Sequence, residues 1–547
     1  MENIKDQDLL DEIRFDIKVK DLRKAQLVLA ALEHVNRETQ KEALFEVAQA
    51  EESFSIRLLT GVFVNTPDIA RSFPHLKETM YSKILGYPEV LLDLLSNEQD
   101  PLTKIFLAKV AGEICLEAAV PIQLDLLTRE SDPKTLESII ISLGMIGSPD
   151  SAGPISEFLH APDRELVLAA VRALGELATP KAMQRLFDRL GEDPDLDQEI
   201  INIFSKAQTP EALEKLNDTL ISQHAHIRTA GKQKLGEIGV MSVRILIKNL
   251  LKVDPDLVIH SLNVLGDIGD PLAIPAIRKL LHNNPENANI RFAAYETLGR
   301  LPVDQGAFAL AAGLEDPAAN VRNAAAKAID RNYNAVLAGG IRNMTCSGDD
   351  EALRIMETII NSQCDNIFLD LLEEGFFKPA AIAYLSKNAH PEIRSYYSEV
   401  LTSKGYDDIA KQIALSKAVK VKAVLRVYAV DDSRMILHIY RTVLHNLGCE
   451  SMLFEFPAKA LENVRKDNPD VILTDLNMPD ITGIDLTAGV RKLFTNEEMP
   501  IIMVTTQDEA KDNQSAYNAG VNGILQKPFT ESRIRGALKK FAGLTLD

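Results

Sequence analysis

Tryptophan is absent from this 547-residue chain, and aromatic residues make up only 5% of it. The chain therefore offers little material for the aromatic platforms on which proteins stack nucleic-acid bases. The chain has 60 basic residues against 79 acidic ones, which gives a formal net charge of −19. This charge would repel a phosphate backbone unless the basic residues were strongly segregated. Composition and charge both argue against nucleic-acid binding.

Cysteine is scarce too, and the four cysteines stand far apart without a CxxC pair. We therefore expect neither a structural zinc site nor a disulfide framework. We expect free thiols in a reducing cytoplasm instead. No uninterrupted apolar stretch is long enough to cross a bilayer. The polar, acidic residues 1–8 do not resemble a signal peptide. We expect a cytoplasmic protein without membrane insertion.

The chain has 46% apolar and 25% charged residues, which is typical of soluble globular proteins. It is too long for one compact core, so several domain-sized units are expected. The spacing of apolar residues changes in the last quarter, which predicts two parts of different fold class.

A glycine that follows leucine or alanine recurs through the first three quarters of the chain. Asp-Pro or Pro-Asp pairs keep the same spacing of about thirty residues, which corresponds to two short helices and two turns. In one unit, Leu136, Ile139, Ile140 and Leu143 form one apolar helical stripe behind Asp132-Pro133. We expect the signature glycines to permit close helix packing; they are Gly112, Gly144, Gly175, Gly236, Gly266 and Gly299.

The repeat resembles the HEAT-repeat family in its short bacterial form. We assign residues 1–405 to a HEAT-like helical array, an α-solenoid that is clearest over 100–330, has an irregular N-terminal part at 1–99 and a C-terminal cap at 351–401. The resemblance implies an elongated curved surface that binds another macromolecule, but it does not identify this partner, which we expect to be a protein. An enzymatic array, similar to bilin lyases or to DNA glycosylases, is an alternative.

Three arginines stand near the starts of repeats, each after an apolar residue. They are Arg228, Arg291 and Arg322. We expect them to pair with acids of the neighbouring repeat; the alternative is a ladder of anion-binding sites.

Residues 406–422 contain no proline or glycine and predict a helical connector. From 423 to 547, apolar runs alternate with helical patterns, which predicts a doubly wound (βα)5 parallel sheet. In such a sheet the site lies at the carboxyl ends of the strands. The expected strands are 424–430, 452–456, 471–473, 501–504 and 523–525.

The strand ends carry polar side chains that suit phosphate chemistry. Asp431-Asp432 follows the first strand and Asp475 the third. Three clustered carboxylates repel one another unless a cation lies among them, and their oxygens suit Mg²⁺. We predict Mg²⁺ on Asp432, Asp475 and the Asn477 backbone carbonyl, with Asp431 holding a water ligand. Asp475 is then the phospho-acceptor.

Two further strand ends complete this set. Thr505 ends the fourth strand and can donate a hydroxyl hydrogen bond to a phosphoryl oxygen. Lys527 follows the fifth strand and can supply an ammonium. A carboxylate that attacks phosphorus needs no general base.

The motifs Asp431-Asp432-Ser-Arg, Asp475-Leu-Asn-Met-Pro-Asp with Gly483, Val504-Thr505 and Lys527-Pro528-Phe529 occur in order. Together they resemble the receiver domain of bacterial response regulators, particularly the single-domain chemotaxis type. The resemblance implies phosphorylation of Asp475 by a histidine kinase or phosphotransfer protein. Two positions depart from the family: Ile524 replaces a frequent aromatic residue, and Thr506 a frequent alanine.

We therefore predict a response regulator of a phosphorelay, in which the phosphorylated receiver modulates protein binding by the array. The chain is not expected to be an enzyme beyond the receiver's own phosphorylation and dephosphorylation. A static scaffold with a receiver that only docks is the remaining alternative. Neither the cognate kinase nor the target protein follows from the sequence.

Overall fold

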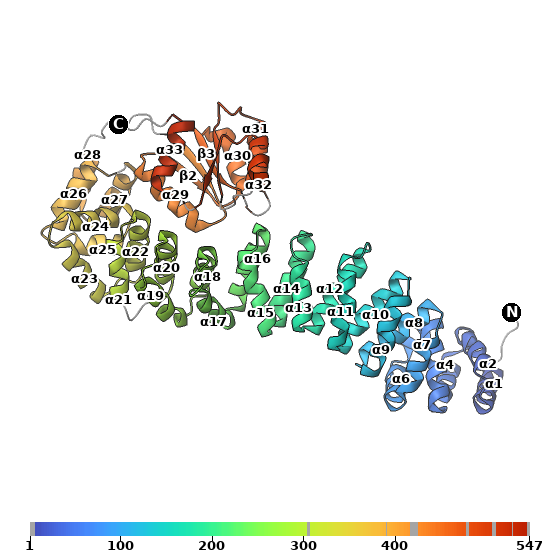
Figure 1. Ribbon diagram of the computed structural model, residues 1–547. Coiled ribbons are helices and arrows are strands. Elements are labelled where there is room, and N and C mark those ends of the chain that lie inside the picture. The colour runs from blue at the N-terminus through green and yellow to red at the C-terminus, as the bar shows by residue number, and fades with distance from the viewer. Residues whose placement is uncertain are drawn as a thin grey trace. The chain divides into compact units, whose positions relative to one another are not determined.

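The computed structural model describes residues 6–302, 307–389, 391–415, 425–476, 478, 481–505, 510–527 and 529–543. The chain divides into two compact units, Met1–Leu216 and Asn217–Asp547. The first unit and the start of the second are helical throughout their described parts, as the sequence repeat predicts (Figure 1).

The first unit consists of paired helices joined by short turns. Its α-helices are α1 (Asp6–Val19), α2 (Leu22–Leu29), α3 (Arg37–Gln49), α4 (Glu52–Asn65), α5 (Pro67–Ser72), α6 (His75–Gly86), α7 (Pro88–Asn97), α8 (Pro101–Glu113), α9 (Val120–Arg129), α10 (Pro133–Ile146), α11 (Ala152–Ser156), α12 (Arg164–Leu177), α13 (Pro180–Asp188) and α14 (Pro194–Ala207). Helix α15 (Pro210–Asp218) crosses into the second unit.

Asp-Pro pairs start several of these helices. In α10 the Asp132 carboxylate accepts a hydrogen bond from the Thr135 backbone N–H, and Pro133 occupies the first helical position. The side chain satisfies a donor that the helix itself leaves open, and the proline has no N–H to lose. Gly147, with φ of +81°, then ends the helix. The predicted start of this helix at Asp132-Pro133 is confirmed.

Three of the six signature glycines bring successive repeats into backbone contact. A Cβ on Gly144 would lie 2.8 Å from the Cα of Ala173, and one on Gly112 would lie 2.9 Å from the Cα of Ser142. In the second unit, a Cβ on Gly299 would lie 2.9 Å from the Cα of Ala328. Close packing is confirmed at these positions. A Cβ on Gly175 or Gly266 would instead meet a side chain at 2.9 Å, that of Ile203 or Arg300, and one on Gly236 would meet nothing within 4 Å.

The second unit begins with the rest of the array. Its helices are α16 (Ala225–Ile238), α17 (Val240–Asn249), α18 (Pro255–Ile268), α19 (Ile274–His282), α20 (Ala288–Arg300), α21 (Ala307–Ala311), α22 (Ala319–Arg331), α23 (Ala335–Thr345), α24 (Asp350–Asn361), α25 (Asp365–Leu371), α26 (Phe377–Lys387), α27 (Pro391–Ser403) and α28 (Asp407–Leu415). Helix α28 lies inside the predicted connector, and the end of that connector falls on residues 416–424, outside the described part.

The arginine prediction is correct for one residue of three. Arg291 forms a bidentate pair with Asp316, at 2.7 and 3.0 Å. Arg228 instead donates to the carbonyls of Ser222 and Gln223, and Arg322 to those of Asp316 and Pro317. These two arginines cap the preceding turn and form no ion pair among the described residues. The shared sequence position did not distinguish these two uses.

The second unit ends in a five-stranded parallel sheet, as predicted. Its strands are β1 (Arg426–Val430), β2 (Glu450–Phe454), β3 (Val471–Asp475), β4 (Ile501–Thr505) and β5 (Gly523–Gln526), in the order β2-β1-β3-β4-β5. Five helices connect and follow them: α29 (Arg434–Asn446), α30 (Pro457–Asp467), α31 (Gly483–Arg491), α32 (Ala510–Ala519) and α33 (Glu531–Phe541).

Both faces of the sheet are covered. Val427 and Ala429 of β1 face a core formed with α29 and α33, whereas Tyr428 and Val430 face a core formed with α30, α31 and α32. Figure 1 shows these two helical layers on opposite sides of the strands. Burial on both faces explains why the central strands are continuous apolar runs.

Two further predictions concern the cysteines and membrane-spanning helices. Cys364 and Cys449 are buried, Cys115 and Cys346 are exposed, and all four are free thiols. In the described part of the chain, no helix combines the length and apolar character that a membrane crossing requires.

Candidate functional site

The strand register brings the polar strand ends to one edge of the sheet. Val430 of β1 pairs with Thr474 of β3, so Asp431 and Asp475 follow at the same level. On the other side of β3, Asp475 pairs with Val504, which places Thr505 next to it on β4. Residues far apart in sequence therefore meet because the strands run parallel and in register.

Three carboxylates gather at this edge. One oxygen from each of Asp431, Asp432 and Asp475 lies within 4.8 Å of the others. Asp431 is fully buried, and the side chain of Asp475 is 11% exposed. Burial raises the pKa of Asp431, and the neighbouring Asp475 and Asp432 raise it further against the opposing effect of Lys527. Burial and then Asp475 also raise the pKa of Asp432. Burial and mutual repulsion therefore both oppose the charged forms of Asp431 and Asp432.

Lys527 joins this cluster from the end of β5. Its Nζ lies 2.6 Å from Oδ2 of Asp431 and 3.1 Å from Oδ1 of Asp475. Burial of the ammonium opposes its charge, but the two carboxylates outweigh that effect and raise the pKa of Lys527 above its ordinary value. The lysine is therefore a fixed cation directly beside the predicted phospho-acceptor.

Backbone geometry fixes the surrounding loops. The Lys527 N–H donates to the Thr505 carbonyl at 2.8 Å, and Thr505 itself is only 2% exposed. The Ser433 N–H donates to Oδ1 of Asp431 at 3.0 Å, just before α29 begins. The Gly483 N–H donates to the Leu476 carbonyl, and a Cβ on Gly483 would lie 2.0 Å from the Asp475 carbonyl oxygen. Glycine is therefore required where α31 starts behind Asp475.

The structure thus brings together Asp431, Asp432, Asp475 and Lys527, with Thr505 beside them. Asn477 lies outside the described residues, as do Thr506 and Pro528. Ile524 of β5 is partly buried and packs against the core beneath α30, α31 and α32. Burial and Asp475 raise the pKa of Asp432 against the smaller effects of Lys232, Lys527 and Arg228, which lower it.

The donor set fits a magnesium ion. Carboxylate oxygens are the ligands that Mg²⁺ prefers, and the ion retains several of its waters when one or two carboxylates bind it directly. Three carboxylates beside one ammonium leave net negative charge in a largely buried pocket, which a dication would neutralise. Among the described residues this is the only cluster of three or more such ligands.

Residues 427–539 match the response regulator receiver domain family, and residues 88–167 and 243–330 match HEAT repeats. Chemotaxis protein CheY1 of Helicobacter pylori is 35% identical over 121 residues, which cover 98% of that protein and 22% of this chain. The chain belongs to the response regulator receiver family. The predicted combination of a receiver domain with HEAT repeats is confirmed.

Other relatives of this response regulator match the same region. The aerobic respiration control sensor protein ArcB of Escherichia coli is 31% identical over 117 residues, or 21% of this chain and 15% of that protein. The chain therefore spans a small part of that relative. The solved receiver domain of sensor histidine kinase PA1611 from Pseudomonas aeruginosa, with magnesium in its active site cleft, is 25% identical; it covers 22% of this chain and 99% of that one, with a TM-score of 0.21.

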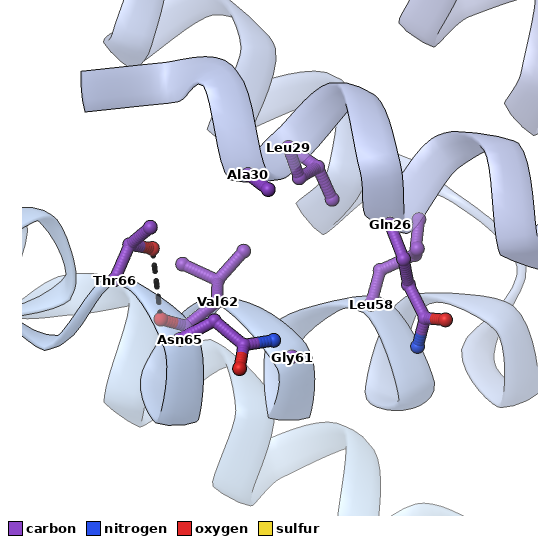
Figure 2. Close-up of a pocket in the computed structure, with 8 residues that line it drawn as sticks. All are labelled: Gln26, Leu29, Ala30, Leu58, Gly61, Val62, Asn65 and Thr66. Atoms are coloured by element: carbon purple, nitrogen blue, oxygen red, sulfur yellow. Dashed lines mark hydrogen bonds between the residues drawn. The ribbon is translucent and has the colours of Figure 1, made fainter.

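The first unit contains a small crevice between α2 and α4 (Figure 2). Gln26, Leu29 and Asn65 are among its lining residues, and the Thr66 hydroxyl donates to the Val62 carbonyl at 2.9 Å beside them. Its volume of about 10 Å³ admits roughly one water molecule. A flipped base or a bilin cannot enter this crevice, so it gives no support to an enzymatic array.

Proposed function

We propose that this chain is a cytoplasmic response regulator that accepts a phosphoryl group on Asp475 from a histidine kinase or a phosphotransfer protein. The observation that carries the proposal is the position of Lys527 between Asp431 and Asp475 at the carboxyl end of the sheet. An ion pair that only stabilised the fold would need one acid as the partner of Lys527. The second and third carboxylates are explained by metal binding and by phosphoryl transfer.

In the proposed reaction, a carboxylate oxygen of Asp475 attacks the phosphorus of the donor. The P–N bond of the phosphohistidine breaks, the electron pair and a proton go to the leaving imidazole, and an acyl phosphate forms. Magnesium, when bound to Asp431, Asp432 and Asp475, supplies positive charge for the phosphoryl oxygens. The Lys527 ammonium and the Thr505 hydroxyl are the remaining partners for these oxygens. In dephosphorylation, water attacks the phosphorus, the bond to the Asp475 oxygen breaks, and inorganic phosphate leaves with the carboxylate restored.

The proposed output is a change in protein binding by the HEAT-like array. Stacked repeats present long surfaces that suit protein partners. For such a switch to work, phosphorylation must change the free-energy difference between two arrangements of the receiver and the array. On this proposal the chain catalyses only its own phosphorylation and dephosphorylation.

The test is incubation of the full-length protein with Mg²⁺ and acetyl phosphate, followed by intact mass measurement. The mass should rise by one phosphoryl group, and Asp475→Asn should abolish the rise. Asp470→Asn is the matched control, because Asp470 lies at the other end of β3 and accepts from the Arg426 N–H. An unchanged mass in the wild type, with Mg²⁺ and a cognate donor present, would refute the proposal.

A second measurement distinguishes this switch from a static scaffold whose receiver only docks. Hydrogen exchange over the array should differ between the phosphorylated and unmodified protein if the array responds to Asp475. Identical exchange with full phosphorylation would support the static scaffold instead.

A further inference from the structure

A cavity lies inside the second unit where the receiver packs on the array. Helix α29 of the receiver contacts α22 of the array. The cavity has a volume of about 260 Å³, and its described lining residues come from α20, α22 and α29. One water molecule needs roughly 10–15 Å³ of such space, so the cavity has room for a small organic molecule.

One part of the lining is apolar and tightly packed. Phe292 of α20 and Ala328 of α22 line the cavity and are buried. Gly299 lines it as well, and a Cβ there would lie 2.9 Å from the Cα of Ala328. Helices α20 and α22 therefore meet at their backbones beside the cavity, and this close packing holds that wall in place.

The polar part of the lining is mostly basic. Lys327 and Arg331 of α22 contribute to it, as does Arg441 of α29. Glu296 of α20 is the one acid among the described lining residues, and its carboxylate lies 3.9 Å from Arg300. Three cations against one carboxylate leave a formal excess of two positive charges in the described lining.

The two arginines come from different domains. Arg331 and Arg441 are exposed, and neither forms an ion pair or a hydrogen bond with another described residue. Packing of α29 on α22 therefore brings like charges to one cavity, which is unfavourable by itself. Burial lowers the pKa of Lys327, and Arg441 and Arg331 act in the same direction. All three cations thus lie within electrostatic range of one another.

A phosphate group complements this lining. A phosphate monoester carries a charge of about −1.5 to −2 at pH 7, which matches the excess of two positive charges. Guanidinium groups bind phosphate oxygens through two parallel hydrogen bonds. A phosphate group between Arg331 and Arg441 would also turn the repulsion across the interface into attraction.

We propose that the cavity between α20, α22 and α29 binds the phosphate group of a small molecule, with Lys327, Arg331 and Arg441 as its partners. The bound anion joins residues of the array and of the receiver, so it favours the docked arrangement of the two. The site shares no residue with the acid cluster. It is therefore an input to the protein that does not depend on phosphorylation of Asp475.

The test is isothermal titration calorimetry of the full-length protein in metal-free buffer at constant ionic strength. Without a metal ion, the acid cluster repels phosphate and does not contribute. The probes are ribose 5-phosphate, inorganic phosphate and succinate, a dianion whose two charges lie at opposite ends. Both phosphates should bind at one site, and succinate should bind more weakly. An equal affinity for succinate would overturn the assignment to a phosphate group.

Two variants locate the site. Arg331→Gln and Arg441→Gln should each weaken phosphate binding about tenfold, the usual effect of losing one hydrogen bond to a charged group. Both side chains are exposed, so neither substitution should prevent folding. The matched control is Arg535→Gln, because Arg535 lies on the receiver helix α33 and pairs with Glu531 at 2.7 Å. Its loss removes the same charge from the same domain and should leave the affinity unchanged.

Glu296→Gln should have the opposite effect. It removes the one carboxylate of the described lining and should tighten phosphate binding about fivefold, since one nearby charge has that effect on a dianion through a largely aqueous dielectric. A substitution that merely loosened the fold would weaken binding instead. Unchanged affinities in Arg331→Gln and Arg441→Gln, or no phosphate binding by the wild type, would overturn the site. Neither result would affect the proposed phosphorylation of Asp475, which the mass measurement tests separately.

The two phosphate probes distinguish the source of the ligand. Tighter binding of ribose 5-phosphate would support a site for an organic phosphate, and tighter binding of inorganic phosphate would support a site for the free ion. With the tighter probe at saturation, backbone amides of α22 and α29 should exchange with deuterium more slowly. Amides of α8, in the other unit, should not change. Unchanged exchange in α22 and α29 would overturn the proposed joining of array and receiver.

Discussion

The ammonium of Lys527 lies 2.6 Å from Oδ2 of Asp431, which joins two residues 96 positions apart. The same ammonium lies 3.1 Å from Asp475. One buried cation therefore holds the ends of β1, β3 and β5 together, and it does so at the atoms on which phosphoryl transfer is proposed.

Replacement of Lys527 by methionine should destabilise the second unit by about 3 kcal/mol, because it leaves buried carboxylates without a counterion. Calorimetry in the presence of a chelator should show a lower melting temperature, and Mg²⁺ should recover part of the loss. Lys466→Met is the control, since the pair of Lys466 with Glu462 is 63% and 71% exposed; its effect should be near zero. Equal melting temperatures for the two variants would contradict a role for Lys527 in balancing these charges.

Magnesium should stabilise the wild type. At about a hundred times its dissociation constant, a ligand that binds only the folded state adds about 2.7 kcal/mol. The gain, measured as a rise in melting temperature, should disappear in Asp432→Ala. A potassium salt of the same ionic strength separates specific binding from screening. An equal rise with potassium would show that the acid cluster does not bind the metal specifically.

Gly144→Ala should destabilise the first unit by about 1–3 kcal/mol, the usual effect of overpacking. The added Cβ would lie 2.8 Å from both the Cα and the Cβ of Ala173, so α10 and α12 would have to separate. Gly236→Ala is the matched helical control, because a Cβ there meets nothing within 4 Å. It should gain about 0.5–1 kcal/mol from helix propensity. Thermal unfolding followed by circular dichroism should show opposite signs; two shifts of the same sign would contradict the packing role.

Arg291→Met should cost about 3–5 kcal/mol. Arg291 is bidentate to Asp316, and both side chains are buried, at 10% and 8% exposure, so the substitution leaves an uncompensated buried charge. Arg342→Met is the control: its pair with Asp370 is 44% and 30% exposed and should contribute less than about 1 kcal/mol. Calorimetric scans of both variants test the difference, and similar losses would argue against it.

Most of the sheet could be predicted from apolar runs, because strands buried on both faces leave a continuous signal. Strand β2 shows the limit of that signal. It begins at Glu450 rather than at Met452, and its exposed and partly buried residues alternate because it lies at the edge of the sheet. An apolar run cannot mark the polar half of such a strand.

The array shows a similar limit. Asp132-Pro133 caps a helix as the repeat predicts, whereas Asp316 of the last Asp-Pro pair binds Arg291, and α22 starts later, at Ala319. Arg228 and Arg322 bond to carbonyls of the preceding turn rather than to acids. A repeat fixes the position of a residue in its helix pair but not which neighbour its side chain reaches.

The sequence by itself determined the two fold classes, the strand ends and the residues that each strand end carries, because local periodicity and short motifs encode them. Only the tertiary structure decided which charges act on one another. The ammonium of Lys527 reaches Asp431 through the strand order. That relationship joins chain segments 96 positions apart, and no spacing within the sequence specifies how such segments pack.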